Sequence, residues 1–405
     1  MILAIVRFGA QIAIPGIDVV SIKLEQELAS TGTLYNIIAG GYNSNWSIVA
    51  MGIGPYITSS IIMQLLTVAI PKIEQLSKEG EEGRKKISKY SRYLTVVLAT
   101  IQAIGLTYRF ASQSMFLTTN QFIYIAAVIS LVAGTTLIMW LAEQITAKGI
   151  SNGSSMIIFV NIISNLPAGL TTLIGYTQID GILDTVGLGK VSAIVLLLLA
   201  VLVFIVVVNN GERKIPVQYS SKVAGNRSYG GKSTFIPIKV NTGGVISIIF
   251  AISLLQFPET ISQFLPVSTS GTLGVVIEAL KMTNPSGAAL YVILIILFSY
   301  FYTSIVINPI EMAENMKKNG GFIPGIRPGQ PTSSYITRVV GRITFVGAIV
   351  FATIAFVPIL LQWIFGFEVG FGGTTLVIVV GVCLDVVKSL ESQLLMRHYK
   401  GFLND

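Results

Sequence analysis

The stretch MGIGPYITSSIIMQLLTVAI, Met51 to Ile70, contains no charged side chain. A helix needs about 20 apolar residues to cross roughly 30 Å of hydrocarbon, so this stretch predicts a membrane span. The whole chain shares its character: of 405 residues, 52% are hydrophobic and only 11% are charged, whereas soluble domains carry about 25% charge. The composition therefore predicts a membrane protein.

Ten apolar runs of this kind occur along the chain. The first begins at Met1, already inside its apolar stretch, so we expect a cytosolic segment before it to be missing from this sequence. The fifth and seventh runs are interrupted by Gly, Ser or Asn, as is tolerated where a helix lines a cavity. The runs cover residues 1–14, 47–70, 93–108, 121–142, 154–168, 191–208, 243–257, 289–307, 343–364 and 374–392.

The basic residues alternate between the connecting segments. The segments 71–92, 143–153, 209–242, 308–342 and the tail from Lys388 hold 22 of the 27 Lys and Arg residues. The other side holds four, and Arg7 lies within the first run. Basic loops remain in the cytosol, so this bias predicts ten spans with both termini cytosolic.

Ten spans divide naturally into two halves of five, and the second half must then be inverted relative to the first. We expect an N-terminal half at 1–168, an external hinge loop at 169–190, a C-terminal half at 191–393 and a cytosolic tail at 394–405. The fold class is an all-α polytopic membrane protein with ten transmembrane helices in two inverted halves. Inverted repeats of this kind are common in transporters, with the site between the halves.

Motifs for catalysis are scarce. The single Cys383 excludes an internal disulfide framework, and the single His398 excludes an HExxH metal site. The segment AGNRSYGGKST, residues 224–234, resembles a phosphate-binding loop, but Lys232 comes one place too late. We expect no cofactor and no enzyme activity, and we expect Cys383 to be a small core residue.

Two further classes of function stay open on the residues alone. A secondary transporter of small solutes fits ten inverted spans, and it predicts a polar or charged site at the membrane midplane. An intramembrane enzyme predicts a catalytic pair at membrane depth.

Isoleucine stripes mark two of the spans. Ile53, Ile57 and Ile61 recur every four residues, and Ile150, Ser154 and Ile158 repeat the spacing in KGISNGSSMIIF. Ordinary core packing explains such stripes, with Gly149 and Gly153 as a GxxxG helix contact. A shared pore lining is the functional alternative.

The cytosolic loops combine basic residues with rigid turns. In loop 209–242, IPVQY and FIPIKV predict a short hairpin with proline-blunted edges. In loop 308–342, the stretch GFIPGIRPGQ frames Arg327 with two prolines and three glycines. Topology requires positive charge but no rigid frame, so a held guanidinium predicts bidentate binding of a phosphate or carboxylate.

Six long stretches carry a resemblance: IAIPGID, GIGPYITSSIIMQLLT, EGEEGRKKISKYSRY, MWLAEQITAKGISNGSSMIIF, NPIEMAENMKKNGGFIPGIRPG and FGGTTLVIVVGVCLD. They resemble the SecY family, the central subunits of bacterial protein-translocation channels. They occur in order along the whole chain. The resemblance implies a clamshell of two five-helix halves around an hourglass pore that opens sideways to lipid.

The same resemblance assigns residues to four roles. The pore ring is Ile53, Ile57, Ile150, Ser154, Ile158, Ile249 and Ile378, where Ser154 departs from the family's apolar residue. The external plug is Leu34, Tyr35, Asn36, Ile37, Ile38, Ala39, Gly40, Gly41 and Tyr42. The lateral gate contains Thr58, Ser60, Gln64, Ser247 and Ser253. Docking of a motor or ribosome falls to Arg213, Lys214, Arg227, Lys232, Arg327 and Pro328.

The implied function is a passive channel in the bacterial plasma membrane. It passes unfolded secretory polypeptides across the membrane and releases nascent membrane helices sideways into lipid, with the ring and plug as its seal. The implied partners are small SecE-like and SecG-like membrane subunits, the SecA motor ATPase, the ribosome, and signal sequences. Energy would come from the motor or the ribosome.

Overall fold

The computed structural model describes most of the chain. The description covers residues 2–17, 47–112, 116–117, 120–175, 178–179, 182–183, 185–219, 222–224, 227–229, 233–240, 242–262, 272–282, 284–365 and 373–401.

Each of the ten apolar runs contains a helix. In chain order these helices are α1 (Ile2–Gly9), α4 (Gly54–Ala69), α6 (Glu81–Ser112), α7 (Gln121–Lys148), α8 (Gly153–Gly175), α9 (Thr185–Asn210), α10 (Gly244–Ser262), α12 (Pro285–Val306), α14 (Gln330–Phe365) and α15 (Gly373–Gly401). Three shorter helices connect them: α5 (Pro71–Lys78), α11 (Thr272–Leu280) and α13 (Pro309–Lys318).

Among the described residues, five helical segments are long and apolar enough to cross a membrane, and the bent pair α4–α5 makes a sixth if counted as one span. The five are Glu81–Ala111, Gln121–Lys148, Val191–Asn210, Pro285–Lys318 and Gln330–Val357. Two shorter apolar stretches, Gly153–Ser164 and Gly244–Leu255, belong to α8 and α10. These two are the interrupted runs that the sequence marked.

Prolines and asparagines fix several helix starts. Proline stands in the first turn of α4, α5, α12 and α13, where its missing N–H costs nothing. The Asn120 side chain accepts a hydrogen bond from the Phe122 N–H at the start of α7, at 3.2 Å. Ile70 adopts an extended conformation before Pro71, and the chain bends there by 100° between α4 and α5.

The helices extend beyond their apolar runs. α6 begins at Glu81 in the basic segment, α14 begins at Gln330, and α15 continues to Gly401. The predicted hinge loop 169–190 is also shorter in the structure, because α8 ends at Gly175 and α9 begins at Thr185. Hydropathy predicts the part of a helix that lies in the membrane and not where the helix ends, so it does not reveal these extensions.

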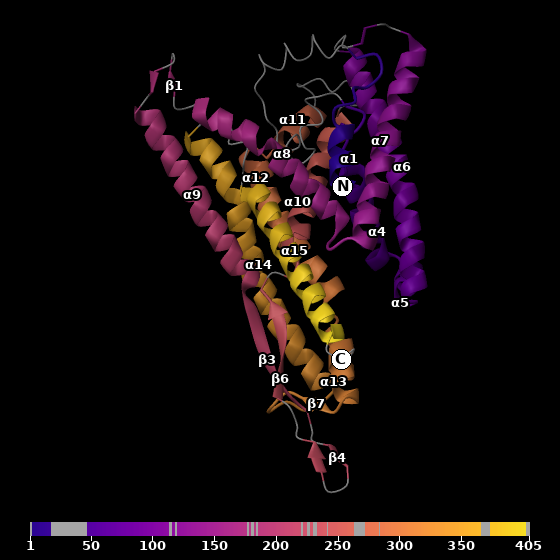
Figure 1. Ribbon diagram of the computed structural model, residues 1–405, viewed down its shortest axis with the longest axis vertical. Helices are drawn as coiled ribbons and strands as arrows, with labels where there is room; N and C mark the ends of the chain where they lie inside the picture. The colour runs from indigo at the N-terminus through magenta and orange to yellow at the C-terminus, as the bar shows by residue number, and fades with distance from the viewer. Residues whose placement is uncertain are drawn as a thin grey trace.

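Several basic connecting segments lie toward the same end of the molecule. Figure 1 shows the β3–β6 sheet, α13 and the C-terminal end of α15 in its lower part, and α5 at the lower end of the α4, α6 and α7 group on the right. The small hairpin of β1 (Gln178–Ile179) and β2 (Ile182–Leu183) lies at the opposite end.

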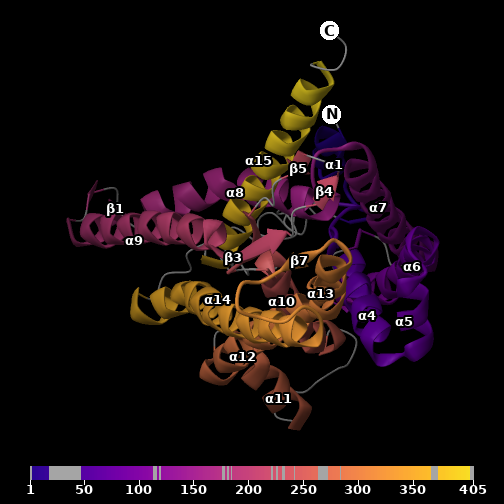
Figure 2. The ribbon, with the colours of Figure 1, turned by 90° about the horizontal axis from the view of Figure 1, so that it is seen from below.

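Helices from the two predicted halves meet near the centre. α4 packs against α10, and α8 packs against α15. Seen from below, α10 lies between α4 on one side and α12 and α14 on the other (Figure 2). The largest hydrophobic cluster spans both halves and takes buried residues from α4, α8, α10 and α15 alike.

A small sheet stands outside the helical body. β3 (Glu212–Tyr219) pairs antiparallel with β6 (Ser233–Lys239), with Ile215 opposite Ile236. This confirms the hairpin predicted from IPVQY and FIPIKV. A second short hairpin joins β4 (Lys222–Ala224) to β5 (Arg227–Tyr229).

The sheet has a third strand that the sequence did not predict. β7 (Gly321–Phe322) comes from loop 308–342 and pairs with Gln218 and Tyr219 of β3. β3 is therefore the central strand at this end, while its edge at Pro216 has no β7 partner. A separate hydrophobic cluster, which includes Ile215, Val217, Ile323 and Ile336, lies beneath this sheet.

Candidate functional site

Isoleucines from four helices come together in the central cluster. Ile53 precedes α4, Ile57 lies on α4, Ile158 on α8 and Ile378 on α15; all four are buried in one cluster. Ile249 of α10 is partly buried against the same cluster. These four helices form the more extensive contacts between the halves within the described ranges, α4 with α10 and α8 with α15.

Two predicted ring positions have different surroundings from the other five. Ile150 is in the turn between α7 and α8, is 42% exposed, and is not a member of the cluster. Ser154 is in the first turn of α8, one turn before Ile158, and its hydroxyl donates to Asn152 Oδ1 at 2.6 Å.

Ile162 is a further buried isoleucine of α8 that the predicted ring did not include. It lies one helical turn after Ile158, is 1% exposed, and belongs to the central cluster. The interval from Ile158 to Ile162 repeats that from Ile53 to Ile57, so the four-residue spacing was a usable signal.

The helix-contact interpretation of the two glycines near α8 is wrong in detail. Gly149 ends α7 and Gly153 begins α8, so they do not lie on one helix. A Cβ at Gly153 would fall on the Ala142 carbonyl oxygen of α7. Gly153 alone, and not the pair with Gly149, therefore permits the close approach between α7 and α8.

The predicted gate residues lie along α4 and α10, which contact each other. Thr58 donates its hydroxyl to the Gly54 carbonyl at 3.1 Å, and the Gln64 amide approaches Ser60 Oγ at 3.4 Å. Among the described residues, the side-chain carbonyl oxygen of Gln64 and the Ser247 hydroxyl are buried without a hydrogen-bond partner. Ser253 is half-buried on α10. Buried polar atoms without partners destabilise the packing that buries them.

The predicted plug, Leu34 to Tyr42, lies outside the described residues. The turn before it is described: Gly16 has a φ of 82°, and a Cβ there would meet the Ile123 side chain of α7. The positive φ and the lack of room for a Cβ both make glycine the favoured residue in this turn.

The Arg327 loop is held on both sides. Ile323 is buried in the cluster beneath the sheet, and Ile326 packs against it. Gly325 and Gly329 have φ values of 81° and 103°, which favour glycine. The Arg327 carbonyl accepts a hydrogen bond from Thr332 Oγ1 at 2.9 Å. The backbone is thus anchored while the Arg327 side chain is exposed.

The exposed Arg327 guanidinium has no ion-pair partner within 4 Å among the described residues. Pro328 beside it is also exposed. The loop therefore presents an uncompensated, pre-positioned positive charge to solvent.

The other predicted docking residues are more scattered. Arg213 and Lys214 are exposed on β3, and Lys214 lies 3.4 Å from Glu212. Arg227 belongs to β5, while Lys232 lies outside the described residues.

The structure offers no support for a metal centre within its described ranges, where no group of three or more His, Cys, Asp and Glu residues is placed to hold an ion. Cys383 is exposed on α15. The expectation of a small core residue is wrong, because that face of α15 is turned outward.

The family profile of SecY matches residues 47–387, most of the chain. The chain belongs to the SecY family. A protein translocase subunit SecY of Halalkalibacterium halodurans is 44% identical over 100% of this chain and 95% of its own length. That of Bacillus subtilis is 40% identical over 100% of this chain and 95% of its own. The SecY match thus covers both predicted halves.

Solved structures agree on the fold. One described as a protein conducting channel has a TM-score of 0.66 at 18% identity, covering 96% of this SecY-family chain and 90% of its own. Sec61 in a canine ribosome–channel complex has a TM-score of 0.64 at 17% identity, covering 96% and 90%. Sequence relatives and structural neighbours alike do not favour the solute transporter.

Proposed function

We propose that this chain is the pore subunit of a protein-translocating channel, which passes unfolded secretory polypeptides and releases apolar helices sideways into lipid. The family membership supports this proposal. The observation that carries it is the meeting of isoleucines from α4, α8, α10 and α15 where the two halves touch. A pore that is lined by both halves can widen when the halves move apart.

The ring in this proposal is Ile53, Ile57, Ile158, Ile162, Ile249 and Ile378, with Ile162 in place of Ile150 and with Ser154 left out. In the closed state these side chains pack as a core. Their apolar surface resists ions by dewetting, because a charge at the bilayer centre costs at least about 2.5–3.5 kcal/mol on insertion scales. Isoleucine side chains form no directional bonds, so the ring discriminates little between passing residues. The segment 34–42 serves as the external plug.

The gate in this proposal is the α4–α10 contact. The unpartnered polar atoms of Gln64 and Ser247 weaken the closed packing. An apolar signal sequence that enters between α4 and α10 reaches lipid by partitioning. The closed gate is therefore stable enough to seal and weak enough to open.

The rigid Arg327 loop serves as a docking point on the cytosolic side. A phosphate of ribosomal RNA or a carboxylate on a motor ATPase suits a held guanidinium. We place the chain in the bacterial plasma membrane with both termini in the cytosol, beside small SecE-like and SecG-like subunits. The motor or the ribosome supplies the energy, and the channel hydrolyses nothing.

The test is reconstitution of the chain with its small subunits in proteoliposomes, together with a SecA-type motor, ATP and an unfolded secretory protein. We expect the secretory protein to become protected from added protease, in an ATP-dependent way. Saturable uptake of a small solute without such protection would overturn the proposal.

A further inference from the structure

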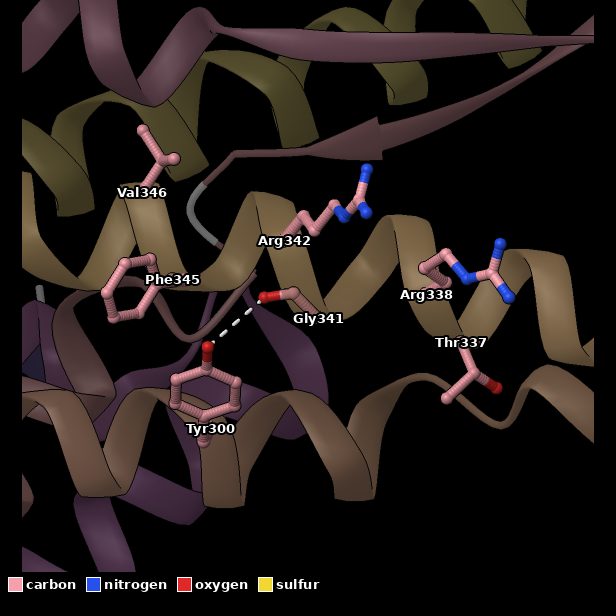
Figure 3. A pocket seen from close by; sticks show the side chains of 7 residues that line it. All are labelled: Tyr300, Thr337, Arg338, Gly341, Arg342, Phe345 and Val346. Carbon is pink, nitrogen blue, oxygen red and sulfur yellow. Dashed lines mark hydrogen bonds between the residues drawn. The ribbon is translucent and has the colours of Figure 1, made fainter.

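A pocket of about 520 Å³ opens between α12 and α14. Tyr300 of α12 lies on one side, and Arg338, Gly341, Arg342, Phe345 and Val346 of α14 lie on the other (Figure 3). It lies apart from the central cluster, since none of these six residues belongs to it. The pore and gate residues named above do not line this pocket.

One end of the pocket is positively charged. Arg338 and Arg342 are one helical turn apart, and both guanidinium groups extend on the same side of α14 (Figure 3). Both side chains are exposed, and no carboxylate among the described residues lies within 4 Å of either one. Their two charges therefore remain uncompensated within the described protein.

The other end is apolar. Phe345 is 51% exposed, Val346 is 57% exposed and Tyr300 is 40% exposed. Arg342 directly precedes the apolar run that begins at residue 343, so the pocket crosses from basic to apolar within one turn of α14. That change is expected where a helix enters the hydrocarbon from the cytosolic headgroup layer.

The middle of the pocket is kept open by glycine. A Cβ added at Gly341 would meet no atom within 4 Å. The Tyr300 hydroxyl donates to the Gly341 carbonyl at 3.2 Å, which fixes the tyrosine at the pocket's edge. Glycine in a helix interior destabilises the helix by roughly 0.5–1 kcal/mol relative to alanine. Gly341 therefore does not add to the stability of α14.

We propose that this pocket binds one anionic phospholipid of the cytosolic leaflet. Arg338 and Arg342 bind the headgroup phosphate, since arginine forms paired hydrogen bonds with phosphate oxygens. The first acyl segment lies along Phe345 and Val346. Basic pockets between membrane helices on the cytosolic side suit such lipids. The inference goes beyond the channel function and rests only on the membrane placement of this end.

This surface differs from the Arg327 loop because apolar side chains lie beside its two arginines. A free phosphate or an RNA backbone would gain nothing from Phe345 and Val346, because neither carries apolar chains. An acyl chain gains from both, by removing apolar surface from water. The combination therefore favours a lipid over a soluble anion.

The test is native mass spectrometry of the purified chain after reconstitution in nanodiscs of phosphatidylcholine with phosphatidylglycerol. We expect one phosphatidylglycerol to remain bound to the native chain. In the double variant Arg338→Gln/Arg342→Gln the affinity for this lipid should fall about tenfold, so the lipid should be lost. The matched control is Lys317→Gln/Lys318→Gln, which removes two exposed charges from nearby α13 and should retain the lipid.

A second variant separates shape from charge. Gly341→Leu fills the pocket with both arginines kept, and leucine is a good helix former, so the fold should persist. We expect it to lose the retained lipid as well. Lipid retention unchanged in both variants would overturn the proposal.

Competition identifies the ligand. Inorganic phosphate at millimolar concentration should not displace the lipid; displacement would reduce the pocket to a simple anion site and overturn the proposal. Weaker motor or ribosome binding by the double variant, with lipid retention intact, would assign the arginines to docking instead. A failure here leaves protease protection in the translocation assay untouched, so the two proposals are separable.

Discussion

Arg92 Nε lies 2.7 Å from Glu143 Oε1, so an ion pair joins α6 to α7. The two residues are 51 positions apart in the chain, and Glu143 is only 18% exposed at its side chain. The pair fixes the relative positions of two long helices near the basic end, where α6 has left its apolar run.

Replacing Glu143 with Gln should lower stability modestly. Arg92 is half exposed and keeps its hydration, so the loss should be about 0.5–1 kcal/mol and not the larger value of a buried pair. A thermal unfolding curve of the purified chain measures it. Lys85→Gln is the control, since it removes an exposed pair with Glu81 on one helix and should change almost nothing. Equal shifts in both variants would contradict the role given to the Arg92–Glu143 pair.

The ring predicts an ion leak when its apolar surface is broken. Ile57→Ser and Ile162→Ser should each raise ion conductance in planar bilayers, because a hydroxyl favours wetting of the constriction. Ile138→Ser is the matched control, since Ile138 is equally buried in the same cluster but belongs to α7, outside the ring. Silent membranes with both ring variants, or an equal leak from the control, would count against the ring.

The gate predicts a gain in closure from removal of one polar atom. Ser247→Ala removes a buried hydroxyl without a protein partner and should stabilise the closed state by about 1–3 kcal/mol. Translocation of a protein with a weakened signal sequence should slow fivefold or more. Ser59→Ala is the control, because the Ser59 hydroxyl donates to the Ser91 carbonyl at 2.6 Å within the first half. It should lower thermal stability without that selective slowing; faster translocation by Ser247→Ala would refute the gate argument.

Docking predicts a strong effect at Arg327. Arg327→Glu should abolish motor-driven translocation while insertion and folding persist, since a charge-assisted contact of about 1.5–3 kcal/mol is replaced by repulsion. Motor binding to proteoliposomes measures the loss as at least a tenfold weaker affinity. Lys318→Glu makes the same charge change on exposed α13 and should bind the motor nearly normally. Full activity in Arg327→Glu would remove the docking role.

The loop's rigidity predicts a separate effect at constant charge. Gly325 has a φ of 81° and open space around its missing side chain, so Gly325→Ala strains only the backbone, by roughly 1–2 kcal/mol. We expect weaker motor binding with an unchanged charge. Gly189→Ala, in helix α9 with equally open space, should be neutral or slightly stabilising. Motor binding unchanged in Gly325→Ala would mean that the charge of Arg327 suffices.

The sequence predicted the parts of the fold that apolar patterning controls. The positions of ten helices and the gathering of basic segments at one end followed from hydropathy and charge. The extension of α6 back to Glu81 did not, because its first turns are charged and carry no membrane signal. β7 was missed because a two-residue strand has no period to detect, and its pairing partner lies about 100 residues away.

The central cluster could be anticipated in part. Ile53, Ile57, Ile158, Ile249 and Ile378 lie in or against it, whereas Ile150 lies outside it and Ile162 inside it. Spacing alone leaves the direction of a stripe open, and only the start of α8 at Gly153 shows that Ile150 lies before the helix. Cys383 was misplaced because composition does not tell which face of a helix looks outward.

The strand β3 links two loops that are far apart in the sequence. It pairs with β6 on one side and with β7, next to the Arg327 loop, on the other. β6 leads within a few residues to α10, and α14 packs so closely on Val240 that a Cβ at Gly347 would overlap its carbonyl oxygen. The sheet therefore gives a continuous path of paired backbone from the Arg327 loop, through β7, β3 and β6, to the start of α10. Neither loop can shift without disturbing a strand that the other loop also holds.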